Sequence, residues 1–301
     1  LFMVASLGFW RGIVFSDSLL LRVAVARECD PASRYGYALG YLGGGLLFAV
    51  NVLMTLHPQW FGLANATEAV RWSFVSVGAW WLLFALPCAL YVHEQRDTQA
   101  RVPLAIAVRQ GFGELRGTLR EIARYRPLLW FLAAYILYID GVYTIIKMAV
   151  DYGLSQGLSA TDVTGAILLT NFLGFPAALA FGALGTRIGP RRAIYLALVV
   201  YIVATALAVF LTTAPQFYAL AATIGLVQGG VQSLSRSLYA RLIPPEKSGE
   251  YFGFFNMLGK FAAVLGPVLM GAVSLLTGNP RFSILSLLVL FVGGALLLAR
   301  V

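Results

Sequence analysis

Few side chains in this sequence could do chemistry, and most of them lie inside apolar runs. The stretch LYIDGVYTIIKMAVDYG at residues 137–153 carries Asp140 and Lys147 directly after an apolar segment. An ionisable side chain inside a membrane helix is costly and marks a functional site by default. Asp140 could bind and release a proton, or it could form a structural ion pair with Lys260 or Arg236. Both interpretations stay open.

Asp140 shares its depth with three polar side chains of other runs, if each run is a helix that rises about 1.5 Å per residue. These side chains are Lys260, Asn171 and Gln228. Substrate sites of secondary transporters lie near the middle of the bilayer. The sequence therefore predicts a pathway for a substrate or a proton, with the following candidate residues: Asp140, Lys260, Asn171, Gln228, Gln232, Arg11 and Asp17.

Two further cations have no obvious partner close by in the sequence. Arg11 cannot pair with Asp17 on the same helix, because a spacing of six residues places them on opposite sides. Arg11 could instead bind a substrate carboxylate or an acid of another helix. Lys147 follows Asp140 by seven residues, on the same face but about 10 Å further along the axis. We expect its long side chain to reach the outer headgroups.

Polar residues near the ends of two apolar runs predict gate groups or caps for helix-end carbonyls. Ser233 and Arg236 lie toward the end of one run, and Asn256 lies in the run that follows. The two cysteines and two histidines show no metal spacing and no catalytic cluster. We therefore expect no metal, no cofactor and no enzymatic activity.

The composition indicates that these side chains are positioned by a membrane protein. Of 301 residues, 59% are hydrophobic and only 12% are charged, and the mean hydropathy is +0.80. A soluble domain carries about 25% charged residues. The net charge of +9 could indicate nucleic acid, but the basic residues lie in short loops rather than on one soluble face, so no nucleic-acid partner is expected.

Nine runs are long and apolar enough to cross a bilayer as helices, which need about 20 such residues. They predict an all-α, polytopic transmembrane bundle. Basic and base-poor loops alternate between them, so the basic loops and the C-terminus are expected in the cytoplasm. The runs cover approximately residues 1–24, 36–57, 71–92, 128–150, 162–184, 193–212, 216–241, 251–276 and 282–300.

A long basic loop at 94–127 divides the chain into three runs at 1–93 and six runs at 128–301. Six helices are half of a transporter built from inverted three-helix repeats, so we expect three further helices upstream and twelve in the intact protein. The loop is partly amphipathic, which predicts a surface helix at anionic headgroups or, as an alternative, a regulatory docking site. Its apolar and basic positions are Leu115, Leu119, Ile122, Arg116, Arg120 and Arg124.

Several motifs resemble those of a known transporter superfamily. The loop FGALGTRIGPRR at 181–192 is similar to a loop of the major facilitator superfamily, although Thr186 stands where an Asp is usual. The matching residues, whose arginines could bond helix-end carbonyls, are Gly182, Arg187, Gly189, Arg191 and Arg192. The segments SRYGYALGYLGGG, YIDGVYTII, VQSLSRSLYARLIP and YFGFFNMLGKFAAVLGP together resemble the autophagy-related vacuolar amino-acid effluxers and their bacterial relatives.

The resemblance implies the major facilitator fold and a secondary transporter of a small polar solute, with amino-acid export as the first substrate hypothesis. Ile139 and Tyr143 replace an Asn and a Gln of the family pattern, which bears on the substrate. The alternative is a scaffold or lipid-handling relative that transports nothing. We expect a monomer in a bacterial inner membrane, coupled to protons if Asp140 titrates.

Gly36, Gly40 and Gly44 recur every four residues and predict a face for close helix packing.

Overall fold

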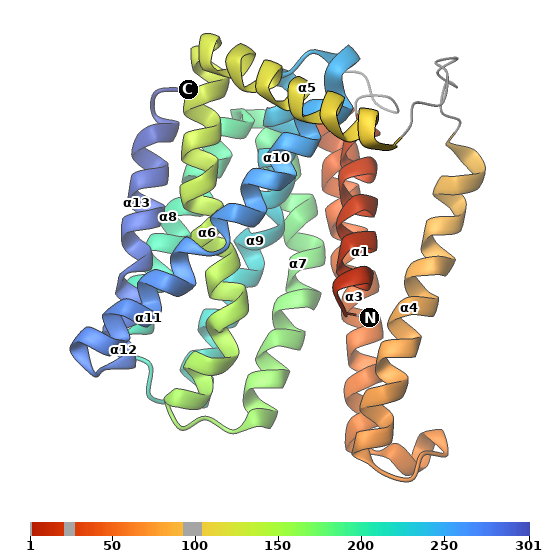
Figure 1. Ribbon diagram of the computed structural model, residues 1–301. Coiled ribbons are helices and arrows are strands. Elements are labelled where there is room, and N and C mark those ends of the chain that lie inside the picture. Colours follow the sequence, from red (N-terminus) through yellow and green to blue (C-terminus); the bar gives the residue numbers. More distant parts are fainter. Residues whose placement is uncertain (1, 21–27, 93–103) are drawn as a thin grey trace.

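The computed structural model describes residues 2–20, 28–92 and 104–301, and every regular element within these ranges is helical. The predicted all-α class is therefore confirmed (Figure 1). The α-helices are α1 (Phe2–Ser18), α3 (Cys29–Leu56), α4 (Ala66–Tyr91), α5 (Leu104–Arg124), α6 (Arg126–Ser155), α7 (Ala160–Ile188), α8 (Pro190–Ala208), α9 (Ala214–Leu242), α10 (Ser248–Ala262), α11 (Leu265–Thr277), α12 (Pro280–Leu285) and α13 (Leu287–Leu298).

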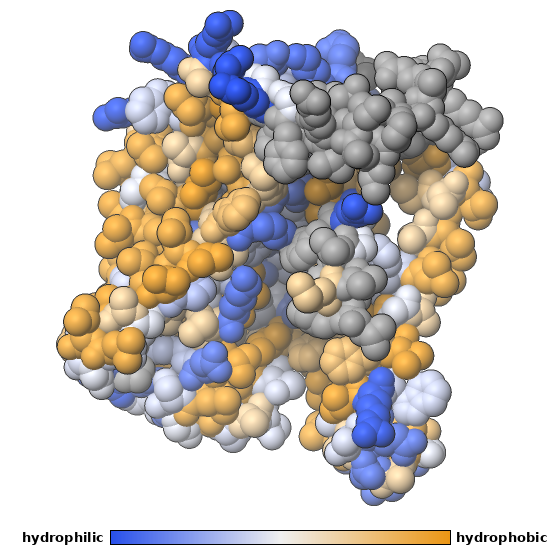
Figure 2. Space-filling model, in the orientation of Figure 1, coloured by the Kyte–Doolittle hydropathy of each residue, from blue (hydrophilic) through white to orange (hydrophobic). Residues whose placement is uncertain are grey.

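Seven segments of the described chain are long and apolar enough to cross a membrane. The other two predicted runs are helical as well, but α1 has only 17 residues and the 29-residue α9 is richer in polar side chains. The count of nine crossings stays a prediction. Figure 2 shows that apolar residues dominate the middle of this face of the bundle, with polar residues gathered toward the two ends.

The helices form two groups with α5 lying across one end (Figure 1). The first group is α1, α3 and α4, and the second is α6 to α13. We call the end at which α5 lies the basic end, because the chain places Arg191, Arg241 and Lys247 there. The C-terminus lies at the same end (Figure 1).

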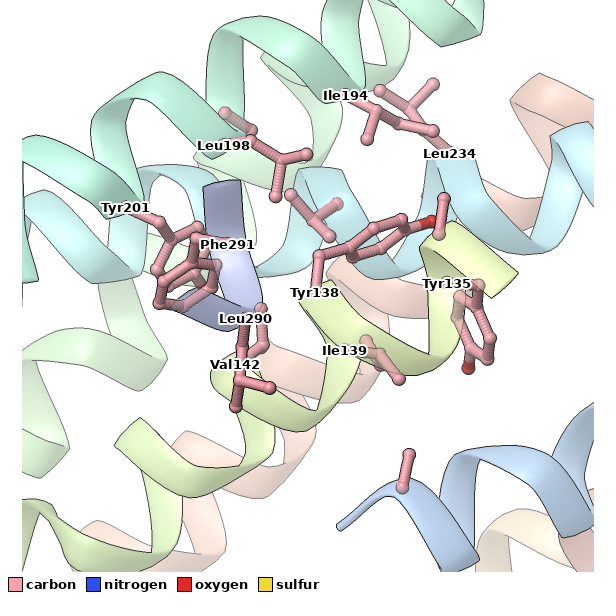
Figure 3. Close-up of a cluster of buried hydrophobic side chains, with 14 of the residues drawn as sticks. Tyr135, Tyr138, Ile139, Val142, Ile194, Leu198, Tyr201, Leu234, Leu290 and Phe291 are labelled. Atoms are coloured by element: carbon pink, nitrogen blue, oxygen red, sulfur yellow. The ribbon is translucent and has the colours of Figure 1, made fainter. Parts of the chain in front are cut away.

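The core of the second group is built around close contacts between α6 and α13 (Figure 3). Phe291 and Tyr201 are fully buried and stack with their ring centroids 5.1 Å apart. A Cβ atom on Gly141 would come within 2.8 Å of the Phe291 ring, and one on Gly294 would come within 2.9 Å of Tyr138. The two glycines therefore let α13 approach α6, next to Asp140.

The predicted run 251–276 falls within one segment, Pro245–Thr277, that is long and apolar enough to cross a membrane, and its helix is interrupted at Ala263 and Val264. Pro267 accounts for the interruption. In an unbroken α-helix the N–H of this residue would bond the carbonyl of Ala263, and proline has no N–H and crowds that carbonyl. The chain therefore ends α10 and starts α11 within the apolar run. We refer to Ala263–Val264 as the break.

The two groups meet where α3 packs against α7 and α9. Glycines of α7 and α9 make this approach possible, since Cβ atoms on Gly174 and Gly229 would each lie within 2.9 Å of the Tyr41 ring. The predicted packing face of α3 is not used in this way. Nothing in the described chain lies within 4 Å of a Cβ on Gly40 or Gly44, and Gly36 has a single neighbour, Arg236, at 3.9 Å.

Toward the other end, α3 and α7 separate. A groove of about 620 Å³ opens between them, bordered by Asn51 and Thr55 of α3, Thr161 and Thr164 of α7 and Tyr218 of α9. Figure 2 shows a notch between the two groups at this end. The groups are therefore in contact near the basic end and parted at the opposite end.

Candidate functional site

A cavity of about 180 Å³ lies inside the second group, between α6, α7, α8, α9 and α11. Its walls are mostly apolar, with side chains such as Ile145, Phe217 and Met270. Ligand pockets combine such apolar walls with a few placed polar groups. Here the polar groups come from α7, α8 and α9 and are Thr170, Asn171, Thr205 and Gln228.

Two of these polar side chains, Asn171 and Gln228, are predicted site residues, and the two threonines were missed. Asn171 and Gln228 both line the cavity, and the Asn171 amide donates to the Ile167 carbonyl at 3.0 Å. Thr205 is buried, and its hydroxyl has no hydrogen-bond partner among the described residues. A lone threonine in an apolar run gives no signal in the sequence, which is why Thr205 was not predicted. Its hydroxyl is available to a ligand.

Gln232 lies one turn beyond Gln228 and connects the two helix groups. The Tyr41 hydroxyl of α3 donates to the Gln232 side-chain oxygen at 2.9 Å. Because Gln228 and Gln232 share a face of α9, this bond lies beside the cavity. A polar link between the groups thus stands next to a candidate binding site.

Asp140 is fully buried on α6 and faces the start of α11. The Thr144 hydroxyl donates to its Oδ1 at 3.4 Å, and its Oδ2 has no hydrogen-bond partner in the described chain. The backbone of Gly266 lies beside the carboxyl group. Neither Lys260 nor Arg236, the ion-pair partners considered from the sequence, pairs with Asp140 here.

Two lysines lie close to the break, Lys147 on α6 and Lys260 on α10. Lys147 donates to the Ala263 carbonyl, with Nζ and O 3.5 Å apart. We expected it to extend to the headgroups; the structure turns its amine toward the break instead. The Lys260 amine lies 5.4 Å from the centre of the Tyr143 ring, a cation–π geometry. Asp140 and Lys260 therefore belong to the break, and not to the cavity that Asn171 and Gln228 line.

The predicted gate residues form a network that joins the groups at the basic end. Asp17 of α1 pairs with Arg236 of α9, with Oδ1 and Nε 2.9 Å apart, and accepts from the Asn256 amide at 2.8 Å. The Ser33 hydroxyl of α3 donates to the Ser233 carbonyl at 2.9 Å. Asp17 was expected in the pathway; it lies in this network.

A second ion pair of the same kind was not predicted. Asp30 at the start of α3 is buried and pairs with Arg241 near the end of α9. Part of the signal was available, since the alternation of basic loops places both residues on the same side of the membrane, but the sequence does not show that their two runs pack together. Arg11 lies apart from both pairs, as an exposed residue of α1.

Three comparisons with known proteins bear on this arrangement. A family model described as "Vacuole effluxer Atg22 like" matches residues 24–301. The chain belongs to this family. The MFS-type transporter YxiO of Bacillus subtilis (strain 168) is 34% identical over 299 residues, which cover 99% of this chain and 69% of YxiO.

One fungal protein and one solved structure are also similar to this chain. Autophagy-related protein 22 of Yarrowia lipolytica is 27% identical over 289 residues, covering 85% of this chain and 48% of the fungal protein; the chain thus spans about half of that relative. A crystal structure of a bacterial homologue of the iron transporter ferroportin, in an outward-facing state, has a TM-score of 0.56 at 16% identity and covers 98% of this chain and 70% of that one. The latter likeness shows the fold alone.

Membership of the Atg22-like family confirms the predicted major facilitator resemblance and makes this chain a multi-pass membrane transporter. YxiO is described as an MFS-type transporter, and the family as vacuole effluxers.

The loop that first suggested the superfamily forms a tight turn between α7 and α8. Gly189 has φ of +88°, a conformation that favours glycine. The Arg191 guanidinium donates to the Ala299 carbonyl at the end of α13, 2.5 Å away, and Gly182 packs against the Arg34 side chain. Arg187 and Arg192 are exposed. This loop of the Atg22-like chain therefore ties helix ends together at the basic end.

Helix α5 is attached to the same end through Glu121. Its carboxylate accepts from the Lys247 amine at 2.6 Å and from the Tyr251 hydroxyl at 2.9 Å. The hydrogen bond from Lys247, and then that from Tyr251, holds the pKa of the Glu121 carboxyl below its usual value. The basic residues Arg116, Arg120 and Arg124 of α5 are exposed. The surface helix predicted from the sequence is thus anchored to the start of α10.

Proposed function

We propose that this chain moves a small polar solute by alternating access, as a secondary transporter. The observation that carries the proposal is an asymmetry between the ends. The Asp17–Arg236 and Asp30–Arg241 pairs close the basic end, whereas α3 and α7 part at the other end. A cavity with polar groups lies between the ends.

The basic end is assigned to the cytoplasm, together with the C-terminus. Support comes from the positive-inside rule, because the basic loops gather at this end. In a bacterial cell the protein would lie in the inner membrane, with the closed end inside and the groove toward the outside. With this orientation, we assign the described state to the outward-facing half of the proposed transport cycle.

Amino acids are the first solutes to test, in the export direction. The support is the description of the family as vacuole effluxers, together with a cavity whose Asn171 and Gln228 amides could bond a polar head while the apolar walls hold a side chain. The full-length protein in proteoliposomes should exchange labelled against unlabelled amino acid. Asn171→Ala and Gln228→Ala should raise KM about tenfold, if each amide bond contributes about 1.4 kcal/mol.

Asp151→Asn provides the matched control, since this residue is exposed and lies outside the cavity. It should leave exchange unchanged. Absence of exchange with every amino acid and with a panel of other polar solutes would refute the proposal and favour the scaffold or lipid-handling alternative.

We also propose that a proton carried by Asp140 couples transport to the proton gradient. The support is a fully buried carboxyl group with one oxygen unpartnered in the described chain. Asp140→Asn should abolish accumulation driven by a pH gradient and preserve exchange, because exchange needs no net proton movement. Gradient-driven accumulation by Asp140→Asn at the wild-type rate would remove Asp140 from coupling.

A further inference from the structure

The break between α10 and α11 leaves backbone groups without helical partners in the middle of an apolar run. Pro267 cannot donate to the Ala263 carbonyl, and the first N–H groups of α11 have no preceding turn to bond. No side chain caps the start of α11 from within the helix. Interrupted helices persist at membrane depth only where protein or a water-filled cavity surrounds the open ends. In the described chain, a neighbouring helix supplies partners for these groups.

One face of α6 supplies them. Asp140, Thr144 and Lys147 recur at positions i, i+4 and i+7 and so share that face. Lys147 donates to the Ala263 carbonyl at 3.5 Å, while Asp140 faces the first turn of α11 at Gly266. Thr144 packs directly against Gly266, where a Cβ atom would collide with it.

The two charges match the two helix ends that they meet. The C-terminal end of a helix carries a partial negative charge and is stabilised by a cation, and the N-terminal end carries a partial positive charge and is stabilised by an anion. Lys147 meets the end of α10 and Asp140 meets the start of α11. The opposite placement would be unfavourable at both ends.

The orientation of α11 matters because this helix is a wall of the cavity. Met270 lies one turn after Gly266, is buried and lines the cavity. A rotation of α11 at the break would move Met270 relative to Asn171 and Gln228 on the facing helices. The break is thus placed where a small change of backbone angle alters access to the cavity.

We propose that Lys147 and Asp140 are positioning residues for transport, which clamp the break from α6 and hold α11 closed against the cavity. Neutralising either charge releases α11. The clamp rests on the proposed function only for its role in transport. Whether the two charges hold α11 in place can be measured without a substrate. The charged group that acts on Asp140 is Lys147 on its own helix. Lys260 on α10 lies near Lys147, and α11 and α13 carry no titratable side chain.

The test measures how accessible the cavity face of α11 is. Met270→Cys is made in the full-length protein, in proteoliposomes, with Cys88→Ser and with any cysteine outside this chain replaced. Cys29 is fully buried and stays. The rate of reaction with N-ethylmaleimide should rise about tenfold in Asp140→Asn and in Lys147→Gln, equivalent to about 1.4 kcal/mol. Lys147→Arg keeps the cation and should restore the wild-type rate.

Asp151→Asn is the matched control, an identical change at an exposed position of the same helix, and should leave the rate unchanged. Titration gives a readout that a merely structural role would not move. The labelling rate of Asp151→Asn, which keeps Asp140, is divided by that of the Asp140→Asn/Asp151→Asn double variant, which lacks it. This ratio should rise as the pH falls and the Asp140 carboxylate is neutralised. Taking this ratio removes the intrinsic loss of thiolate at low pH.

Unchanged rates in Asp140→Asn and Lys147→Gln would overturn the clamp, and so would a Lys147→Arg rate as high as that of Lys147→Gln. If Asp140→Asn does not fold, the comparison of Lys147→Gln with Lys147→Arg decides alone. A failure of the proposed function would look different: no solute would exchange, yet the labelling rates would still follow the charges.

Discussion

At the scale of single residues, Gly141 controls how closely α6 and α13 pack beside Asp140. A Cβ atom there would lie 2.8 Å from the ring of Phe291, which is fully buried and stacked on Tyr201. Overpacking of this kind costs about 1–3 kcal/mol. We expect Gly141→Ala to lower the thermal unfolding temperature of the purified protein in detergent, measured by tryptophan fluorescence.

The control is Gly40→Ala, also a helical glycine but with nothing in the described chain within 4 Å of its Cβ position. This change should be neutral or should stabilise the helix by up to about 1 kcal/mol. Phe291→Leu, which shortens the ring side chain, should recover part of the loss in Gly141→Ala. Equal unfolding temperatures for Gly141→Ala and the wild type would show that α13 can shift without cost.

The sequence predicts that Asp140 is exceptional, because a carboxyl group in an apolar run is expensive wherever it points. It does not predict which groups meet that carboxyl. Sequence reasoning looks for a side chain of opposite charge, and the structure places Asp140 beside the backbone of Gly266. The proline that exposes this backbone stands on another helix, 127 residues along the chain. Such a pairing depends on helix packing, which spacing alone does not specify.

At the scale of elements, α5 depends on the charge of Glu121. The pKa of this carboxyl is lowered by the hydrogen bonds from Lys247 and Tyr251, so its contribution to docking is present above the unbound pKa and is lost as the pH falls through the lowered value. We expect the amides of α5 to exchange with deuterium faster as the pH falls into that range, after correction for intrinsic exchange rates. Glu121→Gln should show the faster exchange at neutral pH.

Glu246→Gln, at an exposed acid next to Lys247, is the comparison and should leave α5 protected. If α5 exchanges equally in Glu121→Gln and Glu246→Gln, its docking depends on apolar contacts such as the buried Ile122 and not on the carboxylate.

The amphipathic pattern predicts this helix well, because its apolar positions repeat with the helical period. Its attachment to α10 is not predicted, since Glu121 lies 126 residues before Lys247.

At the scale of the whole molecule, the proposed cycle requires the two helix groups to part at the basic end. Two ion pairs oppose this movement, Asp17–Arg236 and Asp30–Arg241. In the first pair both side chains are shielded, with Asp17 15% and Arg236 12% exposed, whereas Arg241 of the second pair is 37% exposed. Breaking one partner of a shielded pair leaves the other uncompensated. Asp17→Asn should therefore favour the state in which the basic end is open.

Ser33→Cys reports this state, because Ser33 is fully buried between α3 and the Ser233 carbonyl of α9. In proteoliposomes, labelling of this thiol by a membrane-impermeant maleimide from the basic side should rise about tenfold in Asp17→Asn, for a shift of about 1.4 kcal/mol. Exchanging the charges, as Asp17→Arg with Arg236→Asp, should bring the rate back toward the wild type, since the attraction between the groups is restored. A double variant that labels as fast as Asp17→Asn would mean that the shape of the contact, and not its charge, holds the basic end closed.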